Sequence, residues 1–433
     1  MRILSNGFPT NLPNSEKISQ GGPANFARLF IEYITATNAP HEWVGVMLEA
    51  MPGSPAVKLR TVFKTPRRSY HRLFVPKSTV EAVTKSQDDT DDAAVLWAEP
   101  IARLEEFMRG QRPDVVFLNG FGILNWMLLR AARRVGIPVV TQHAGIWTKE
   151  LRLHRARYSE HGRRMMEAME KESTGLSSVE VFLNWWSRGY YRDNVAVGPL
   201  RRMEVLPLPF DFDSFKKLSS AQKPPRFNFD GSEMHIGVIA RWDEIKNHAA
   251  VLAMAKAAKK KKLPWRFHAV VDIPPQYAAE RAAYGRHVDI LEPLDRTGIS
   301  EFCRSVDLLM LPSVFDVSPT VVLEAVALDT PIVISPTVGF MRDFVSHGAA
   351  AWVINFTDVD TAVRETAAIM GKTMPAELKA ALLQKHNHKS VFAAYLRLFK
   401  EAPLREMSLR EILKRVWRQE WARSLYFPAL RKK

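Results

Sequence analysis

Short runs of apolar and β-branched residues alternate along the chain with segments of helical periodicity. The runs predict two series of strands, the first at 2–5, 43–48, 115–118, 139–142, 180–183 and 205–206, and the second at 235–240, 267–271, 288–291, 308–311, 332–335 and 351–354. Helices are predicted between them, for example at 23–37, 126–135, 247–260, 319–328 and 362–370. Strand–helix alternation is typical of parallel sheets that are covered by helices on both faces. Because so many strands exceed what one sheet comfortably holds, we expect an α/β protein with two sheets.

Residues 214–233 interrupt this pattern. The segment is polar and contains adjacent prolines, which is typical of an interdomain linker. We therefore expect four parts: an N-terminal Rossmann-like domain at 1–213, the linker at 214–233, a C-terminal Rossmann-like domain at 234–400, and a basic amphipathic helix at 401–433. A length of 433 residues agrees with two domains or more.

The composition excludes several classes of protein. A chain with 46% apolar and 25% charged residues is ordinary for a globular protein, not a disordered chain or a fibre. The single cysteine, Cys303, excludes a disulfide scaffold and a cysteine-built metal centre. No apolar run reaches the roughly 18 residues of a spanning helix, and the N-terminus does not resemble a signal peptide. We therefore expect a cytoplasmic protein.

The charge balance is the unusual bulk property. Lys and Arg number 61 against 46 Asp and Glu, a net charge of +15, which favours an anionic partner. Residues 400–433 hold ten Lys or Arg and four Asp or Glu, with apolar residues at near-helical spacing. This tail is interpreted as a docked helix or, alternatively, as a basic amphipathic surface that meets an anionic membrane. No nucleic-acid-binding motif accompanies the charge, so we expect no nucleic-acid partner.

Candidate chemistry is densest after the predicted strand at 308–311. A loop there carries Asp316, and Ser318 and Pro319 predict the start of a helix, with Ser318 as its N-cap. The first free amides, among them those of Thr320 and Val321, then face the crevice where open α/β sheets bind ligands, a place that suits phosphate. Glu324 follows nearly two turns into the helix. Its carboxylate can accept hydrogen bonds from both hydroxyls of a ribose.

Two cations follow the predicted strand at 235–240. Arg241 and Lys246 stand five residues apart on the loop before the next helix. Cations at the carboxyl end of a strand suit a diphosphate whose charge grows as it departs. No acidic metal motif accompanies them, so we expect Arg241 and Lys246 to do the work of a cation, with no cofactor and no obligatory metal.

These two clusters resemble those of the family-4 retaining glycosyltransferases, which have the GT-B fold. That family carries two acidic residues eight positions apart, matched by Asp316 and Glu324, and an Arg-x4-Lys element, matched by Arg241 and Lys246. The resemblance implies two Rossmann-like domains that face each other across a cleft, with a C-terminal helix that crosses back to the first domain. It also implies that Asp316 contacts the donor sugar.

The N-terminal half resembles the family less closely. Gly21 and Gly22, at a predicted helix start, match a Gly-Gly loop that approaches phosphate or acceptor, although the pair could also be an ordinary tight turn. His143, at a predicted strand end, matches a histidine near the sugar, although isolated strand-end histidines are more often structural. Departures from the family are Asp316 itself, where glutamate is usual, and Val317-Ser318-Pro319, where glycines are usual.

The resemblance implies a retaining hexosyltransferase. It would take a nucleoside-diphosphate sugar as donor and a glycan or lipid-linked glycan as acceptor, as in cell-surface polysaccharide biosynthesis, at the cytoplasmic face of the membrane. Front-face attack, in which the leaving phosphate helps to take the acceptor proton, is the implied mechanism. An inactive nucleotide-sugar-binding relative of the same fold remains the alternative. A phosphoryl-transfer or nucleic-acid-binding protein would explain the charge but not the two clusters.

Overall fold

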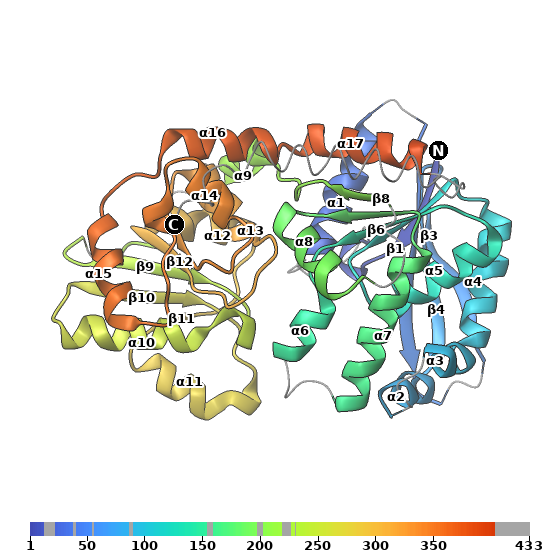
Figure 1. Cartoon of the computed structure of the whole chain (residues 1–433), viewed down its shortest axis with the longest axis horizontal. Coiled ribbons are helices and arrows are strands. Elements are labelled where there is room, and N and C mark those ends of the chain that lie inside the picture. The colour runs from blue at the N-terminus through green and yellow to red at the C-terminus, as the bar shows by residue number, and fades with distance from the viewer. Residues whose placement is uncertain are drawn as a thin grey trace.

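Two α/β lobes lie side by side in the computed structural model, with a pair of helices running across the top of both (Figure 1). The structure describes residues 1–12, 22–37, 40–53, 56–85, 90–153, 159–196, 202–218, 227–229 and 231–402. Three sequence predictions fall outside these ranges: Gly21, the central part of the linker, and the tail helix beyond residue 402.

The N-terminal lobe is built on an eight-stranded sheet of order β3-β4-β2-β1-β5-β6-β7-β8. All neighbouring strands are parallel except β3 and β4, which are antiparallel. The strands are β1 (Arg2–Asn6), β2 (Glu42–Met51), β3 (Lys58–Lys64), β4 (Arg68–Pro76), β5 (Val115–Asn119), β6 (Val139–His143), β7 (Val179–Phe182) and β8 (Arg202–Val205).

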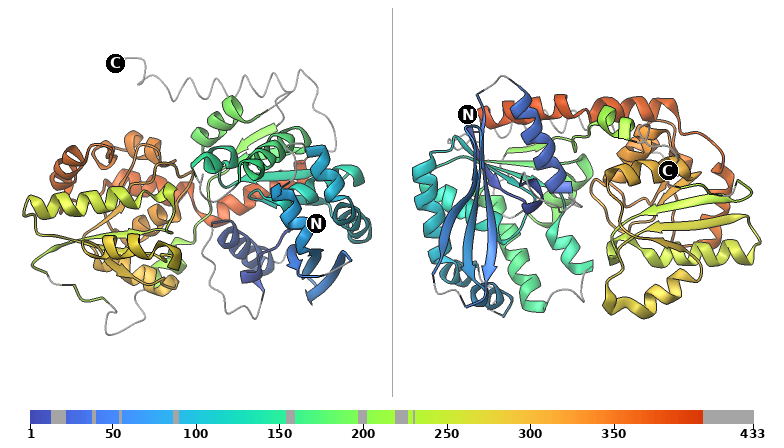
Figure 2. Two further views of the ribbon diagram at one scale, coloured as in Figure 1. Left: turned by 90° about the horizontal axis from the view of Figure 1, so that it is seen from below. Right: turned by 180° about the vertical axis from the view of Figure 1, so that it is seen from behind.

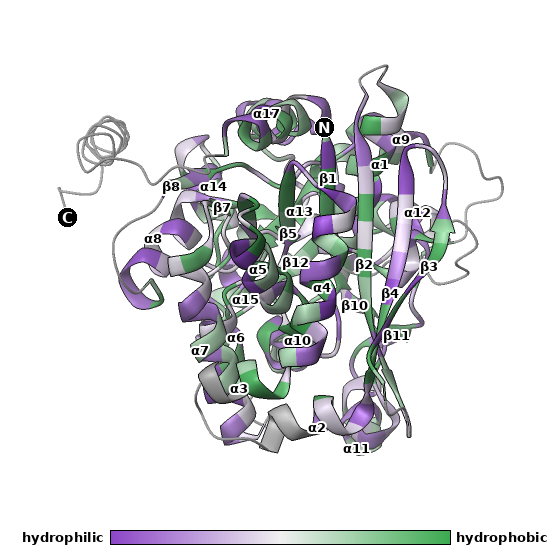
Figure 3. Cartoon of the chain, turned by 90° about the vertical axis from the view of Figure 1, so that its right-hand side faces the viewer, coloured by the Kyte–Doolittle hydropathy of each residue, from purple (hydrophilic) through white to green (hydrophobic). Residues whose placement is uncertain are grey.

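Helices cover this sheet on both faces, as expected for parallel strands. Figure 3 shows helices α4, α5 and α7 with hydrophilic and hydrophobic residues in alternation, because each helix turns one face to the sheet and the other to solvent. The helices of this lobe are α1 (Gly22–Ala36), α2 (Lys77–Lys85), α3 (Thr90–Leu96), α4 (Ala98–Gln111), α5 (Ile123–Val135), α6 (Trp147–Leu153), α7 (Glu160–Leu176) and α8 (Trp185–Asn194), with the 3-10 turn η1 (Pro9–Asn11).

The C-terminal lobe holds a five-stranded parallel sheet of order β11-β10-β9-β12-β13. Its strands are β9 (Met234–Ile239), β10 (Trp265–Val270), β11 (Asp289–Leu291), β12 (Leu308–Leu311) and β13 (Ile332–Ile334). The remaining elements are α9 (Phe212–Leu218), η2 (Glu244–Lys246), α10 (His248–Lys260), η3 (Pro275–Tyr277), α11 (Ala278–Gly285), α12 (Arg296–Ser305), α13 (Thr320–Leu328), α14 (Met341–Ser346), η4 (Ala350–Trp352), α15 (Val359–Ile369), α16 (Ala376–Lys385) and α17 (His388–Glu401).

The two-sheet α/β architecture predicted from the sequence is confirmed, and three local predictions differ. Strands β3 and β4 were not predicted. The edge strand β3 is mostly exposed and polar, and β4 carries buried polar residues, among them Ser69 and His71, which hydrogen-bond to each other at 3.0 Å. The strand predicted at 351–354 is wrong. The 3-10 turn η4 lies there, and Val353 forms a single bridge to Ile334.

The chain returns to the first lobe at its described end. Helix α17 crosses from the C-terminal lobe and packs against α1 (Figures 1 and 2). The ring of Phe392 lies 5.4 Å from that of Phe26 and 5.1 Å from that of Phe30, and the ring of Phe399 lies 5.1 Å from that of Phe117. A helix that crosses back is therefore present, but all of it except Glu401 lies in the range 234–400 that the sequence assigns to the C-terminal domain.

Helix α9 lies where the sequence predicts the linker to begin. It packs against α12 and α13, and its Phe215 is fully buried in the core of the C-terminal lobe. The lobes are also joined directly. The side-chain amide of Asn184, the N-cap of α8, donates a 2.6 Å hydrogen bond to the carbonyl oxygen of Val317. The two domains are thus tied together beside the loop that carries Asp316.

Candidate active site

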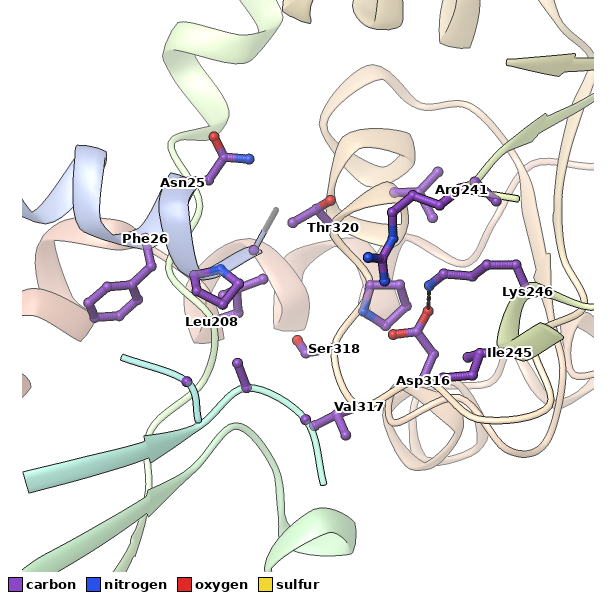
Figure 4. A pocket seen from close by; sticks show the side chains of 18 of the residues that line it. Asn25, Phe26, Leu208, Arg241, Ile245, Lys246, Asp316, Val317, Ser318 and Thr320 are labelled. Carbon is purple, nitrogen blue, oxygen red and sulfur yellow. Dashed lines mark hydrogen bonds and ion pairs between the residues drawn. The ribbon is translucent and has the colours of Figure 1, made fainter. Parts of the chain in front are cut away.

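A cavity of about 820 Å³ lies between the two lobes. Its walls are the segments that follow the carboxyl ends of strands in both sheets, which is where parallel α/β sheets bind ligands. Figure 4 shows Asn25, Phe26 and Leu208 on one side and Arg241, Lys246 and Asp316 on the other. Both domains therefore contribute side chains to one site.

Lys246 and Asp316 form an ion pair at the C-terminal wall (Figure 4). The pair joins two loops that other contacts hold together. The backbone N–H of Val314 donates to the carbonyl of Ile245 at 2.8 Å, and the side-chain amide of Asn247 donates to the carbonyl of Pro312 at 3.1 Å. A cation and a carboxylate that are 70 residues apart in the sequence thus reach the same point of the cavity.

Arg241 lines the cavity with its guanidinium largely exposed; its side chain is 66% accessible. The nearest carboxylate oxygen, of Asp243, lies 3.8 Å away, which is a loose contact. The backbone at Arg241 is fixed, because its carbonyl oxygen is hydrogen-bonded to Nε2 of His248 at 2.8 Å. An exposed guanidinium on an anchored backbone is suited to hold an anion that enters the cavity.

Helix α13 begins beside this pair, one residue later than predicted. Pro319 is its N-cap and forms no side-chain cap, so Ser318 is not the cap. Proline has no side-chain acceptor, and this leaves the first helical amides uncovered by a capping side chain. Ser318, Thr320 and Val321 all line the cavity.

Glu324 lies deeper on α13 and also lines the cavity. Burial raises the pKa of its carboxyl from 4.5 to about 7, and the charge of Arg296 on α12 opposes that rise. The site therefore holds a carboxyl that ionises much closer to neutral pH than an exposed glutamate does. The sequence pattern did not indicate Arg296, which lines the same cavity.

On the N-terminal side, Gly22 begins α1 and lines the cavity with Pro23. The start of α1 is held by the side-chain amide of Asn119, which donates to the carbonyl of Pro23 at 2.6 Å. Gly120, next in the chain, has φ of +82°, a conformation that favours glycine. An added Cβ there would also lie 3.5 Å from the ring of Pro23.

The structure does not bring His143 into the cavity. Its neighbours Gln142 and Ala144 line the cavity, and because side chains alternate along a strand, His143 points away from it. The imidazole is fully buried, stacks on Phe182 with ring centres 4.7 Å apart, and has its Nε2 3.8 Å from a carboxylate oxygen of Glu180. These surroundings fit a structural role for His143. They do not fit contact with a ligand in the cavity.

Glu150 is a cavity residue that sequence reasoning missed. It lies on the short helix α6, and its Oε1 accepts a 3.2 Å hydrogen bond from the backbone N–H of Ile146. A glutamate on a helix after a strand is usually a solvated surface residue, so no sequence pattern distinguishes it. The one signal nearby is Gly145, five residues earlier, because a residue without a Cβ at that position leaves room for the Glu150 carboxylate.

Among the residues that the structure describes, no three His, Cys, Asp or Glu side chains gather as metal ligands would. Over the same residues, no helix has the length and apolar character needed to cross a membrane.

Similarity in sequence to known proteins is limited to part of the chain. Residues 233–372 match the sequence family described as Glycosyl transferases group 1. Over 142 residues the chain is 28% identical to the "Putative glycosyltransferase EpsF" of Bacillus subtilis (strain 168), a match that covers 32% of this chain and 37% of that protein. The matched segments thus cover about a third of each chain.

Similarity to solved structures extends over nearly the whole chain. Sucrose-phosphate synthase from Thermosynechococcus elongatus superimposes with a TM-score of 0.69 at 13% identity, over 92% of this chain and 98% of that one. An E. coli structure bound with UDP-2-fluoro glucose gives 0.66 at 13% identity, over 92% and 99%. The UDP-forming α,α-trehalose-phosphate synthase from Burkholderia xenovorans in complex with glucose-6-phosphate gives 0.66 at 14% identity, again over 92% and 99%.

The fold is GT-B. Residues 233–372, within the C-terminal lobe, are similar in sequence to glycosyltransferases. The predicted fold and the resemblance to glycosyltransferases are confirmed at this level, whereas membership of family 4 stays a prediction.

Proposed function

We propose that the protein transfers a hexose from a nucleoside-diphosphate sugar, with retention at the anomeric carbon. The observation that carries the proposal is the meeting of Arg241, Lys246, Asp316 and Glu324 in one cavity between the two domains. Charges of both signs and a helix N-terminus, arranged around a cavity large enough for a small ligand, suit a nucleotide sugar.

Each group has a chemical task in this proposal. Glu324 accepts hydrogen bonds from the ribose hydroxyls, and the amides at the start of α13 meet a phosphate. Arg241 and Lys246 neutralise the diphosphate as the bond from the anomeric carbon to the phosphate oxygen breaks. Asp316, released from Lys246 by the incoming phosphate, hydrogen-bonds the donor sugar. Gly22, on the N-terminal wall, allows close approach of a ligand.

The acceptor in this proposal is a glycan or a lipid-linked glycan of the cell-surface polysaccharide type, used at the cytoplasmic face of the membrane. The net charge of +15 supports an anionic surface as partner. We further propose that no metal is obligatory, because Arg241 and Lys246 supply positive charge where the diphosphate would lie. Incubation with EDTA is then expected to leave the rate unchanged, and a rate restored only by Mg²⁺ or Mn²⁺ would contradict this.

A two-stage experiment tests the function. Thermal shift with UDP-, GDP- and ADP-sugars identifies the donor, because a bound ligand stabilises the folded state. Donor cleavage and the anomeric configuration of the product are then followed by NMR. Binding with cleavage and a retained configuration supports the proposal. Binding without any turnover would favour the inactive nucleotide-sugar-binding alternative, and absence of binding to every nucleotide sugar would contradict both.

A further inference from the structure

The N-terminal wall of the cavity presents one ionisable side chain whose surroundings suit proton transfer. Glu150 lines the cavity from α6, and α6 contacts η2, the segment of the C-terminal domain that ends in Lys246. The carboxylate therefore lies on the domain proposed to hold the acceptor and lines the same cavity as the groups proposed to hold the donor. Arg241 and Asp316 are close enough to act on its charge.

The position of the Glu150 carboxylate is fixed by its own backbone. Its Oε1 accepts from the N–H of Ile146, four residues earlier, and it lies over Gly145. A Cβ on residue 145 would overlap Oε1, so the place that the carboxylate occupies exists because residue 145 is glycine. Only one oxygen is engaged in this hydrogen bond, and the group lines the cavity, so it can accept a second hydrogen bond from a ligand.

The helix that carries Glu150 is itself anchored. Glu170 on α7 is buried at the start of α6, where it accepts hydrogen bonds from the backbone N–H of Trp147 at 2.9 Å and of Thr148 at 2.6 Å, and from the Thr148 hydroxyl at 2.6 Å. Glu170 therefore holds the start of α6 through three hydrogen bonds, whereas Glu150 adds one, to the Ile146 N–H. Glu170 supports the helix, and Glu150 is left to face the cavity.

We propose that Glu150 is a catalytic residue that hydrogen-bonds the attacking hydroxyl of the acceptor and takes its proton. The inference rests on the proposed glycosyl transfer. In the step, the acceptor oxygen forms a bond to the anomeric carbon while the bond from that carbon to the phosphate oxygen breaks. The nucleoside diphosphate leaves with the electron pair, held by Arg241 and Lys246, and the hydroxyl proton passes to the Glu150 carboxylate. This places the base on the protein, whereas the front-face mechanism assigns it to the leaving phosphate.

The charges around Glu150 match this task. Burial and the negative charge of Asp316 raise the pKa of its carboxyl, with a smaller contribution from Glu170, and the Ile146 N–H and Arg241 lower it; together they bring the pKa to about 7. Lys246 is the last residue of η2, which contacts α6, and its side chain is paired with Asp316. A base is most effective when its pKa lies near the working pH, and Glu150 becomes the active carboxylate as the pH rises through about 7.

Glu150→Gln tests the proposal without removing the local structure, because the amide oxygen can still accept from Ile146. The donor that gives the largest thermal shift is used, and its cleavage with water as acceptor is measured from pH 5.5 to 8.5. We expect wild-type kcat/KM to rise with pH through about 7 and Glu150→Gln to lose about 10²-fold. The pH dependence left in Glu150→Gln should be that of Glu324, whose pKa is also about 7, and the double variant Glu150→Gln/Glu324→Gln should lose it. Glu150→Asp should keep the pH dependence with a smaller loss. Glu160→Gln, an exposed change on α7, is the matched control and should behave as wild type.

Gly145→Ala provides a second, independent test. It keeps every ionisable group but displaces the flexible end of Glu150, so the rate should fall at least tenfold with little change in Tm. A calorimetric readout does not depend on turnover. Nucleoside diphosphate binding at pH 7 should take up more protons in the wild type than in Glu150→Gln, since the bound anion raises the pKa of a neighbouring carboxyl.

The outcomes separate the two proposals. If the wild type cleaves the donor and Glu150→Gln does so at the same rate and with the same pH profile, the role of Glu150 is overturned and the proposed glycosyl transfer stands. Equal proton uptake in both proteins would likewise overturn it. No binding and no cleavage of any nucleotide sugar by the wild type would overturn the function and, with it, the step assigned to Glu150.

Discussion

At the scale of single residues, the charged groups Arg241, Lys246 and Asp316 of the proposed donor site are either paired with an opposite charge or exposed to solvent. Lys246 and Asp316 neutralise each other, and the guanidinium of Arg241 is in solvent. Because the Arg241 side chain is largely in solvent, its substitution should change the rate with little effect on stability, whereas Lys246 is part of a largely buried ion pair.

Arg241→Ala and Lys246→Ala are each expected to slow transfer by about 10²–10³-fold, because each removes a positive charge aimed at the departing diphosphate. The melting temperature should change by only a few degrees in Arg241→Ala and fall further in Lys246→Ala, which leaves the largely buried carboxylate of Asp316 without its partner. Steady-state kinetics with the identified donor and a thermal melt measure the two effects. Lys256→Ala, on α10, is a suitable control. Near-wild-type turnover in both site variants would remove the donor-site assignment.

Glu324 and Asp316 should divide the donor between them. Glu324→Gln is expected to weaken the binding of a nucleoside diphosphate, because an amide oxygen accepts from the ribose hydroxyls less well than a carboxylate. Asp316→Asn should leave that affinity nearly intact and weaken the binding of the nucleotide sugar. Titration calorimetry with both ligands measures this. Equal losses for the plain nucleoside diphosphate in the two variants would show that the division is wrong.

The pKa of Glu324 also predicts a pH dependence. Since the folded-state pKa is raised from 4.5 to about 7, the folded protein holds this proton more tightly than the unfolded chain. The contribution of Glu324 to stability is therefore most favourable below about pH 4.5 and declines as the pH rises through about 7. Glu324→Gln should raise the Tm of the ligand-free protein at pH 8 relative to wild type and leave it almost unchanged near pH 5. The same Tm difference at both pH values would contradict this.

At the scale of elements, the return helix α17 decides how the chain is divided. It leaves the C-terminal lobe and completes the core of the first, where Phe392, Tyr395 and Phe399 meet aromatic rings of α1 and β5. The packing is local to the N-terminal lobe, although the residues come from the far end of the sequence. The stability of the first lobe should therefore depend on the last described helix.

Phe392→Ala is expected to lower the free energy of unfolding of the N-terminal lobe by about 3–5 kcal/mol, because it empties a fully buried aromatic site. Denaturant unfolding, followed by tryptophan fluorescence, measures the change. Lys389→Ala on the exposed part of the same helix should have almost no effect. If the two substitutions cost the same, α17 does not pack as described.

At the scale of the whole molecule, the excess of positive charge favours an anionic surface. We expect the full chain to co-sediment with vesicles that contain anionic lipid at low salt, and to be released as salt screens the attraction. Neutralising the basic residues at 428–433 and their neighbouring arginines should weaken this binding. If the protein binds neither neutral nor anionic vesicles, only the docked-helix interpretation of the tail remains.

The sequence by itself determined the α/β class, the two series of strands and the cluster after each of β9 and β12. Those features are local: apolar periodicity marks the strands, and Arg241 with Lys246, or Asp316 with Glu324, lie within nine residues of each other. Tertiary structure alone decided which side chains share the cavity. His143 and Glu150 lie seven residues apart, and strand alternation turns the first away while the fold of α6 over Gly145 brings the second in. The course of α17 was likewise decided by packing between distant segments, because an apolar helix face does not specify which partner will cover it.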